Sequence, residues 1–375
     1  MMKKLGFGLM RLPLLDAEDQ SSIDMTALCH MADLFLARGF THFDTAYPYH
    51  NGQSEVAFRE AVVKRYPRTA YTVTDKMPLY LLRKEEDLER CFSEQWARLG
   101  LDFIDYYWLH NIGQRSYETA QRLGAFEFLQ KKKEQGLVRH IGFSFHDRAD
   151  VLDRMLTDHP EVEFVQLQLN YLDWDDPNIQ SRLCYETAVR HGKKVFVMEP
   201  IKGGSLIRLP IEAETLLHDL RRDLSPAGWA LLFVAGLPEV VSVLSGMGNA
   251  EQMAENCRLM DEQPPLTKDE RKALARVAEI LRADIAVPCT ACRYCVEGCP
   301  KKIAIPEYFA LYNNLHRFGA AQIGNVQAYY TNLTRTHGKA SDCIGCGQCE
   351  QHCPQHLPIR QHLQRVVQAI ETAED

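Results

Sequence analysis

Cysteine is the residue type whose spacing most clearly predicts chemistry in this 375-residue chain. Eight of its twelve cysteines form two runs with one pattern, Cys289-x2-Cys292-x2-Cys295-x3-Cys299-Pro300 and Cys343-x2-Cys346-x2-Cys349-x3-Cys353-Pro354. Three thiolates spaced by two residues can converge on one iron–sulfur cube. Structural zinc usually takes its ligands as two pairs, and disulfides belong to secreted proteins, which nothing else in the chain resembles. The pattern therefore predicts two [4Fe–4S] clusters.

The fourth cysteine of each run bears on how the clusters are held. In two-cluster ferredoxins the cysteine that precedes proline binds the other cluster, and the two runs here resemble theirs. The resemblance implies a crossed arrangement. The first cluster is then expected to be held by Cys289, Cys292, Cys295 and Cys353, and the second by Cys343, Cys346, Cys349 and Cys299.

A second set of reactive side chains lies in the N-terminal half, each at the end of a short apolar run. The set comprises Asp44, Lys76, His110 and two phenols, Tyr47 and Tyr49. A lysine ammonium that is held by an aspartate beside a phenol stabilises the phenolate and lowers the pKa of the tyrosine. Each residue alone also fits a structural role, as a loop cap or a rim side chain. Together they are the groups needed to protonate a carbonyl oxygen while hydride reaches the carbon.

Repeated strand and helix patterns must position these groups. Short runs rich in β-branched and aromatic residues alternate with segments of helical period up to about residue 260. The predicted strands are 4–10, 41–45, 70–75, 103–109, 138–143, 164–168, 195–199 and 240–244. Eight such pairs are typical of a closed (β/α)8 TIM barrel, an α/β fold that carries its reactive groups at the C-terminal ends of the strands. An open doubly wound sheet is the alternative, but the chain contains no G-x-G-x-x-G.

The remaining sequence divides into a linker and a small domain. We expect the barrel to cover residues 1–260, a linker and bridging helix to cover 261–288, and a mainly helical, ferredoxin-like iron–sulfur domain to cover 289–375. This division follows the size of a single hydrophobic core, which a chain of this length exceeds.

Charge and hydropathy restrict the partners. The net charge is −7 and the pI is near 6.1, which argues against nucleic acid or anionic membrane as the main partner. No apolar stretch approaches the roughly 20 residues that span a bilayer, and the N-terminal residues lack the apolar core of a signal peptide. We therefore expect a cytoplasmic protein.

The N-terminal motifs resemble those of the aldo/keto reductase family. The resemblance rests on Phe43-Asp44-Thr45-Ala46-x-x-Tyr49, Lys76 and Trp108-Leu109-His110, and it covers about residues 4 to 260. It implies that Tyr49 is the general acid, that Lys76 and Asp44 set its pKa, and that His110 orients the carbonyl. The whole chain resembles the subset of that family with a C-terminal two-cluster ferredoxin-like domain.

The resemblance also implies a nicotinamide cofactor, NADP or NAD, although the matching residues are incomplete. Ser144 and Gln166 stand where family members hold the nicotinamide amide. Phe145 replaces the usual asparagine, and Met198 stands where a tyrosine stacks on the ring. His146 is a candidate substitute for the lost polar contact.

The phosphate end of the cofactor site departs further from the family. Counting back from Asn256, the lysine and arginine that clamp a 2′-phosphate are replaced by Gly246 and Gln252, which removes the usual basis for preferring NADP. Backbone amides from Gly246 to Asn249, before a predicted helix, could take a phosphate. Lys202 is a candidate anion contact, against the alternative that it is solvated.

Three functions fit these observations. The first is an oxidoreductase that acts on a small carbonyl or alcohol, with the clusters as a regulatory element or as an electron relay, for which a redox protein is a candidate partner. The second is an electron-transfer protein with a docking barrel, and the third is an ordinary nicotinamide-dependent reductase with structural clusters. Hydride carries two electrons whereas a cluster passes one, so coupling needs either an adapter such as a flavin or a substrate able to form a radical. We recognise no flavin motif in the sequence. We favour the first, because a docking barrel has no need of an Asp44–Lys76 pair.

Overall fold

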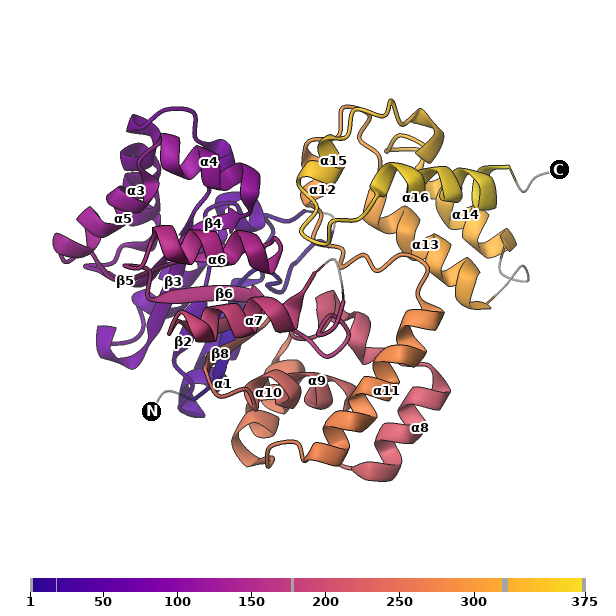
Figure 1. The fold of residues 1–375 in the computed structure, drawn as a ribbon, viewed down its shortest axis with the longest axis horizontal. Coiled ribbons are helices and arrows are strands. Elements are labelled where there is room, and N and C mark those ends of the chain that lie inside the picture. The colour runs from indigo at the N-terminus through magenta and orange to yellow at the C-terminus, as the bar shows by residue number, and fades with distance from the viewer. Residues whose placement is uncertain (1–2, 18, 177–178, 319–322, 373–375) are drawn as a thin grey trace. The chain divides into compact units, whose positions relative to one another are not determined.

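The computed structural model describes all residues except 1–2, 18, 177–178, 319–322 and 373–375 (Figure 1). The chain forms two compact units. The first, the barrel unit, contains residues 1–200 and 227–267, and the second, the cysteine unit, contains 201–226 and 268–375. This division differs from the expected one in two ways, because the barrel unit extends to residue 267, and because 201–226 and 268–288 group with the cysteine-bearing part of the chain.

The barrel unit is a closed parallel barrel, as the strand pattern predicts. Its strands are β1 (Leu5–Gly8), β2 (His42–Asp44), β3 (Thr72–Met77), β4 (Ile104–Ile112), β5 (Val138–Phe145), β6 (Phe164–Gln168), β7 (Lys194–Met198) and β8 (Val240–Ser245). They follow one another around the barrel in chain order, and β8 pairs with β1. All eight predicted strands are confirmed, with ends that differ by a few residues. The C-terminal ends of the strands therefore form one rim.

Helices connect and surround the strands (Figure 1). They are α1 (Met25–Ala37), α2 (Ser54–Phe58), α3 (Glu86–Leu99), α4 (Gln114–Arg122), α5 (Ala125–Glu134), α6 (Ala149–Asp158), α7 (Ser181–Arg190), α9 (Pro226–Ala235) and α10 (Ala250–Glu262). Local signals set their ends. The Asp24 side chain accepts the Ala27 amide at 3.0 Å at the start of α1, and Gly100 takes a left-handed conformation after α3.

Aromatic rings fill the interior of the barrel. His42, Tyr106, Trp108, Phe164 and Phe196 lie with ring centroids 5.1 to 6.1 Å apart in several pairs. Edge-to-face contacts of this kind add to the stabilisation from burial. The interior is therefore a packed core rather than a pore, and it gives the rim a rigid base.

The cysteine unit is mainly helical. Its elements are η5 (Lys202–Ile207), α8 (Ile211–Leu220), α11 (Lys268–Asp284), α12 (Tyr294–Glu297), α13 (Ile305–Phe318), α14 (Ile323–Leu333), η7 (Ala340–Asp342), α15 (Gln348–Gln351), α16 (Ile359–Val366) and η8 (Val367–Glu371). Helix α8 packs against α11 and buries Ala213 and Leu217. That packing explains why 201–226 belongs to this unit.

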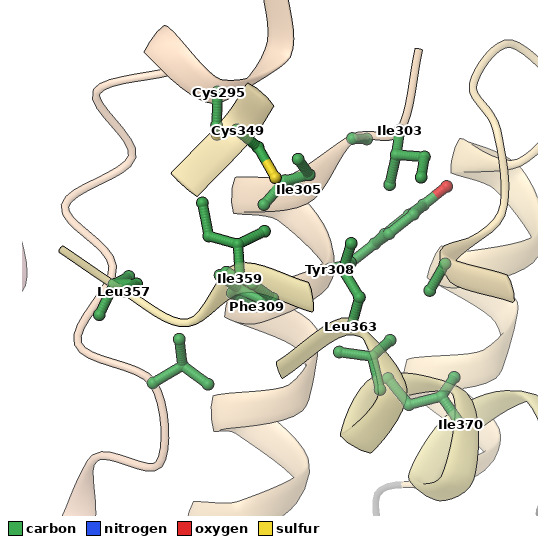
Figure 2. Close-up of a cluster of buried hydrophobic side chains, with 14 of the residues drawn as sticks. Cys295, Ile303, Ile305, Tyr308, Phe309, Cys349, Leu357, Ile359, Leu363 and Ile370 are labelled. Carbon is green, nitrogen blue, oxygen red and sulfur yellow. The ribbon is translucent and has the colours of Figure 1, made fainter. Parts of the chain in front are cut away.

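Apolar side chains from α13 and α16 form the core of the cysteine unit. Figure 2 shows Ile305, Phe309 and Ile359 packed together, with Cys295 and Cys349 beside Ile305. All of these side chains are buried. The core thus holds one cysteine of each run close to the same isoleucine. Among the helices that the structure describes, none is long and apolar enough to cross a membrane.

Candidate functional site

A buried ion pair lies on the barrel rim between two neighbouring strands. Asp44 ends β2, and Lys76 lies near the end of β3, which pairs with β2 in parallel. The Lys76 Nζ donates to Asp44 Oδ1 at 2.5 Å and to the Thr45 carbonyl at 2.8 Å. The two charged side chains are only 1% and 5% exposed. Water therefore screens this pair very little, and each charge depends on the other.

Tyr49 is the phenol that reaches this ion pair. The Lys76 Nζ lies 3.4 Å from the Tyr49 hydroxyl and 5.0 Å from the centre of its ring. Tyr47 instead donates to Glu94 Oε2 at 2.6 Å. Of the two candidate phenols, the structure brings Tyr49 to the lysine.

A tight turn holds Tyr49 in place. The next two residues, His50 and Asn51, both have a φ of +53°. This is a left-handed backbone conformation that residues other than glycine seldom adopt. The imidazole of His50 anchors the turn, because its Nε2 accepts the Leu12 amide at 3.1 Å and its Nδ1 donates to the Gln20 carbonyl at 2.9 Å. Backbone strain at this turn is thus compensated by two hydrogen bonds.

The carboxyl group of Asp44 has a second partner. The Gln166 Nε2 donates to Asp44 Oδ2 at 3.2 Å, and Ser144 is the register partner of Gln166 on the adjacent strand. Burial raises the pKa of Asp44, and the Lys76 ammonium and the Gln166 amide oppose that rise. Asp44 can stay ionised in a buried place because these donors hold it.

His110 completes the rim set. It lies near the end of β4 and is 3% exposed, and its ring meets the Tyr49 ring edge-on with centroids 5.9 Å apart. Burial, followed by the positive charges of Lys76 and His146, lowers the pKa of His110 well below its usual range. The imidazole is therefore neutral near pH 7. Its Nδ1 has no hydrogen-bond partner among the described residues, as expected for a group that binds a ligand.

Sequence reasoning missed a buried network behind this site. Asp75 precedes Lys76 but points to the opposite side of β3, since side chains alternate along a strand. The Asp75 carboxylate accepts a hydrogen bond from Gln95 Nε2 at 2.6 Å. It also lies against the carboxyl group of the buried Glu55, and a hydrogen bond between the two acids requires that one of them is protonated. Glu55 is in turn paired with Arg98 at 2.9 Å. Burial first, and then the nearby carboxylate of Glu55, raise the pKa of Asp75 well above its usual range.

The expected nicotinamide residues are only partly free to bind a ligand. The Ser144 hydroxyl accepts the Asn111 amide at 2.8 Å, and Gln166 is engaged with Asp44. Met198 ends β7 and is partly exposed. These contacts fix the two polar residues in the strands and leave their remaining hydrogen-bonding capacity for a ligand.

The expected phosphate loop is closed by its own side chains. The Gly248 amide donates to Gln252 Oε1 at 2.8 Å, and the Gln252 amide donates to Asn249 Oδ1 at 2.9 Å. The Asn256 Nδ2 donates to Ser245 Oγ at 3.0 Å. These contacts occupy donors that we expected a phosphate to use.

A cationic side chain that sequence reasoning gave no role lies beside this loop. A Cβ added to Gly246 would lie 3.1 Å from Arg11 Cδ. Arg11 ends the N-terminal motif Leu5-Gly6-Phe7-Gly8-Leu9-Met10-Arg11, so its charge type was visible in the sequence. Its position next to the loop after β8 could not be predicted from the sequence.

The two cysteine runs line two separate hollows in the cysteine unit. One hollow, of about 300 Å³ including space open to solvent, is lined by Cys289, Cys292, Cys295 and Cys353. The other, of about 340 Å³, is lined by Cys299, Cys343, Cys346 and Cys349. Each set contains three cysteines of one run and the last cysteine of the other, which is the crossed combination.

The thiols that line these hollows are of the ligand type that iron–sulfur clusters need. Among the described residues, no group of three or more His, Cys, Asp or Glu side chains is arranged to hold a single metal ion. The thiols instead surround a space that a polynuclear group could fill. Burial raises the pKa of Cys289 and that of Cys349 to about 11, so these thiols keep their protons unless a metal replaces them.

Comparison with known proteins agrees with both parts of this geometry. The family model described as "Aldo/keto reductase family" matches residues 4–279. The chain belongs to the aldo/keto reductase family. The model described as "4Fe-4S dicluster domain" matches residues 288–357, so this aldo/keto reductase is an oxidoreductase that carries a dicluster domain.

Its relatives match the barrel. An aldo-keto reductase of Mycolicibacterium vanbaalenii is 30% identical over 243 residues, which is 64% of this chain and 79% of that protein. The NADH-specific methylglyoxal reductase of Escherichia coli is 24% identical over 311 residues, covering 70% and 90%. A structure of an aldo/keto reductase from Klebsiella pneumoniae in complex with NADP and acetate has a TM-score of 0.60, 18% identity and coverage of 74% and 96%. That last similarity shows the shared fold.

Proposed function

We propose that this aldo/keto reductase interconverts a small carbonyl compound and its alcohol at the barrel rim, with Tyr49 as the general acid. One observation carries the proposal. The buried ammonium of Lys76 is held by Asp44 and lies 3.4 Å from the Tyr49 hydroxyl. When the phenol gives its proton to the carbonyl oxygen, the negative charge that remains faces this buried ammonium.

His110 would orient the carbonyl. Because its pKa is lowered well below the usual range, the neutral imidazole can donate one hydrogen bond without adding a charge. The carbonyl oxygen would then receive hydrogen bonds from Tyr49 and His110. Asp44 keeps Lys76 in place and takes no part in the proton transfer itself.

A nicotinamide would supply or accept the hydride when bound. Support comes from the Escherichia coli relative, named as NADH-specific, and from the Klebsiella pneumoniae structure, described as a complex with NADP. Ser144 and Gln166 are register partners on β5 and β6 and are the residues we assign to the nicotinamide amide. The two relatives differ in cofactor, and the closed loop after β8 offers no lysine or arginine at Gly246 or Gln252, so we assign NAD or NADP without choosing between them.

We further propose that the two clusters are held in the crossed arrangement and relay single electrons to a redox protein partner. The second hollow favours a relay, because Cys346 is exposed and the neighbouring Ile344 is 62% exposed. A purely structural cluster has no need of such an opening. A hydride donor and these clusters would still require a flavin or a substrate radical between them.

Exchange of the two tyrosines tests the acid. Tyr49→Phe should lower carbonyl reduction by roughly 10²- to 10⁴-fold while the visible absorption of the clusters persists. Tyr47→Phe is the matched control, because Tyr47 is bonded to Glu94 instead, and it should keep near-normal turnover. Unchanged turnover in Tyr49→Phe would refute the assignment.

Pairs of cysteine substitutions test the crossed arrangement. Cys292→Ser alone should remove about half of the iron. In Cys289→Ser/Cys353→Ser both substitutions remove ligands of the first cluster, so half of the iron should again remain after anaerobic reconstitution. In Cys289→Ser/Cys299→Ser each substitution removes a ligand of a different cluster, so nearly all of the iron should be lost. The opposite pattern would show that each run binds its own cluster, and zinc in place of iron would end the cluster assignment.

An anaerobic titration tests the coupling of the two sites. NADH and NADPH are added separately, and the visible absorption of the clusters is followed. Bleaching by either nucleotide would support a relay and identify the cofactor. Binding without bleaching would instead support structural clusters or a different electron donor.

A further inference from the structure

One buried lysine contacts a residue that lines the first hollow. Lys202 begins η5, the short helix that packs within the cysteine unit, and it is 2% exposed. Its Nζ donates to Gln355 Oε1 at 3.1 Å. Gln355 lines the first hollow and follows Cys353 by two residues. The lysine ammonium is thus hydrogen-bonded to a residue two positions after Cys353, the last cysteine of the first ligand set.

The backbone next to Lys202 closely approaches a second residue that lines the same hollow. Gly203 has a φ of +63°, and a Cβ at this position would lie 2.2 Å from the Thr290 carbonyl oxygen. Thr290 also lines the hollow and directly follows Cys289. Only glycine allows this approach. Segment 202–203 therefore contacts the residues that follow both Cys289 and Cys353.

The lysine charge acts on these two thiols. Burial raises the pKa of Cys289 to about 11 and also raises that of Cys353, and the positive charge of Lys202 opposes the rise in both. An electrostatic effect on both cysteines agrees with the hydrogen bond and the close packing. The hydrogen bond to Gln355 and the close approach to Thr290 by themselves place the ammonium near the first hollow.

The carboxylates that act on the same cysteines are each paired with an arginine. Glu307 is paired with Arg293, and Glu350 is paired with Arg360 at 2.8 Å. Their negative charges are therefore largely compensated. The second hollow also has nearby cations, Lys301 and Arg360, but Lys301 is exposed and Arg360 is the partner of Glu350. The two hollows thus differ in that a buried ammonium lies beside the first.

We propose that Lys202 raises the reduction potential of the first cluster above that of the second, so that a single electron shared by the two clusters resides on the first. Reduction adds one negative charge to a cluster, and a nearby buried cation stabilises that charge. An exposed cation does so much less, because water and salt screen it. The inference rests on the crossed ligand sets proposed above, and it assigns Lys202 to the first cluster rather than to a nucleotide phosphate.

Redox titration of the reconstituted full-length protein, followed by electron paramagnetic resonance, tests the proposal. A Cys346→Ser background removes the second cluster and identifies the signal of the first. Lys202→Met should lower the reduced-to-oxidised ratio of the first cluster by roughly tenfold at the wild-type midpoint, which corresponds to about 59 mV. Lys202→Arg keeps the charge and should stay close to wild type. Lys301→Met, the matched loss of an exposed lysine beside the second hollow, should shift neither cluster.

Other outcomes would overturn the inference. A Lys202→Met protein with full iron and an unchanged first potential refutes it, as does an unchanged potential with a large loss of nucleotide affinity. If Lys202→Met assembles no cluster, Gln355→Glu serves as the test instead. A carboxylate beside the Lys202 ammonium should offset its charge and, like Lys202→Met, lower the reduction potential of the first cluster. The titration contains neither carbonyl substrate nor nicotinamide, so its result is independent of the activity proposed for Tyr49. Iron counts that contradict the crossed sets would locate the failure in the ligand assignment instead.

Discussion

Substitution of Lys76 by methionine should destabilise the barrel in a way that depends on pH. The side chain keeps its length, but Asp44 loses the ammonium at 2.5 Å and retains the Gln166 amide. At an effective dielectric constant of about 20 the lost attraction is about 6 to 7 kcal/mol. Removal of one partner from a buried ion pair typically costs about 3–5 kcal/mol, and we expect a loss in that range near pH 7.

Protonation of Asp44 limits the loss at low pH. Burial already raises the pKa of Asp44, and loss of Lys76 raises it further. A folded-state pKa above the unfolded value means that stability is fully present below the unfolded pKa and is lost as pH rises toward the folded one. The gap in unfolding free energy between wild type and Lys76→Met should therefore widen by up to about 1.4 kcal/mol per pH unit as pH rises above the folded-state pKa of Asp44 in the wild type.

Urea unfolding under anaerobic conditions at pH 5, 6, 7 and 8 measures this gap. Tryptophan fluorescence reports on the barrel unit alone, because all four tryptophans lie there, at positions 96, 108, 174 and 229. Cluster absorption follows the cysteine unit separately. Lys84→Met is the control, since Lys84 is 70% exposed, and it should change stability by no more than about 0.5 kcal/mol.

A double variant separates charge from packing. Asp44→Asn/Lys76→Met leaves no buried charge, so it should recover much of the stability lost in Lys76→Met and show a flat pH dependence. A gap between wild type and Lys76→Met that stays constant or narrows with rising pH would refute the reasoning. So would a double variant as unstable as the single one.

Three further predictions follow from burial and close packing. Asp75→Asn removes one acid of the pair with Glu55. Because the pKa of Asp75 is raised in the folded protein, the free energy of unfolding of the wild type should fall as pH rises. Measured by urea unfolding, the variant should lose less stability than the wild type between pH 5 and 9. Gly203→Ala should lose iron from the first cluster, because its Cβ would overlap a backbone oxygen. Gly204→Ala carries a similar strain, since both glycines have a positive φ, but its Cβ meets no atom within 4 Å, so it should retain the iron. His110→Gln should lower kcat/KM by roughly 10²- to 10³-fold, and wild-type kcat/KM should show no loss from His110 protonation between pH 5 and 7.

Each of these has a contrary result. Equal pH slopes in wild type and Asp75→Asn would mean that the carboxyl pair does not share a proton. Equal iron content in the two glycine variants would show that the backbone at Thr290 can move to accommodate the added Cβ of Gly203→Ala. A wild-type rate that falls with a histidine-like midpoint, and no longer does so in His110→Gln, would show that His110 titrates in the active range.

The barrel could be predicted from the sequence because its signals are local. Each strand is a short apolar run, and glycines such as Gly100 mark where helices end. The residues of the rim set could be chosen because strand ends meet on one rim, which brings Asp44, Lys76 and His110 near Tyr49. Here the strand pattern and the family resemblance pointed to the same residues.

The rest depends on contacts between distant segments. Glu55 lies twenty residues before Asp75 on a helix outside the barrel, and nothing in its neighbourhood marks it as the partner of a buried acid. Likewise, Gln252 could not be recognised as the residue that occupies the Gly248 amide. Lys202 was expected to contact an anion, but the contact of its Nζ with Gln355, 153 positions away, could not be read from the sequence.

The grouping of 201–226 with the later residues also constrains how the chain folds during synthesis. Helix α8 leaves the ribosome before its partner α11, which is completed about 60 residues later, or roughly 3 to 12 s at ordinary elongation rates. During that interval Ala213 and Leu217 lack the helix that covers them. Any shortened gene that stops after the barrel would leave these side chains exposed permanently, so the barrel cannot be isolated by C-terminal truncation alone, and removal of 201–226 would be needed as well.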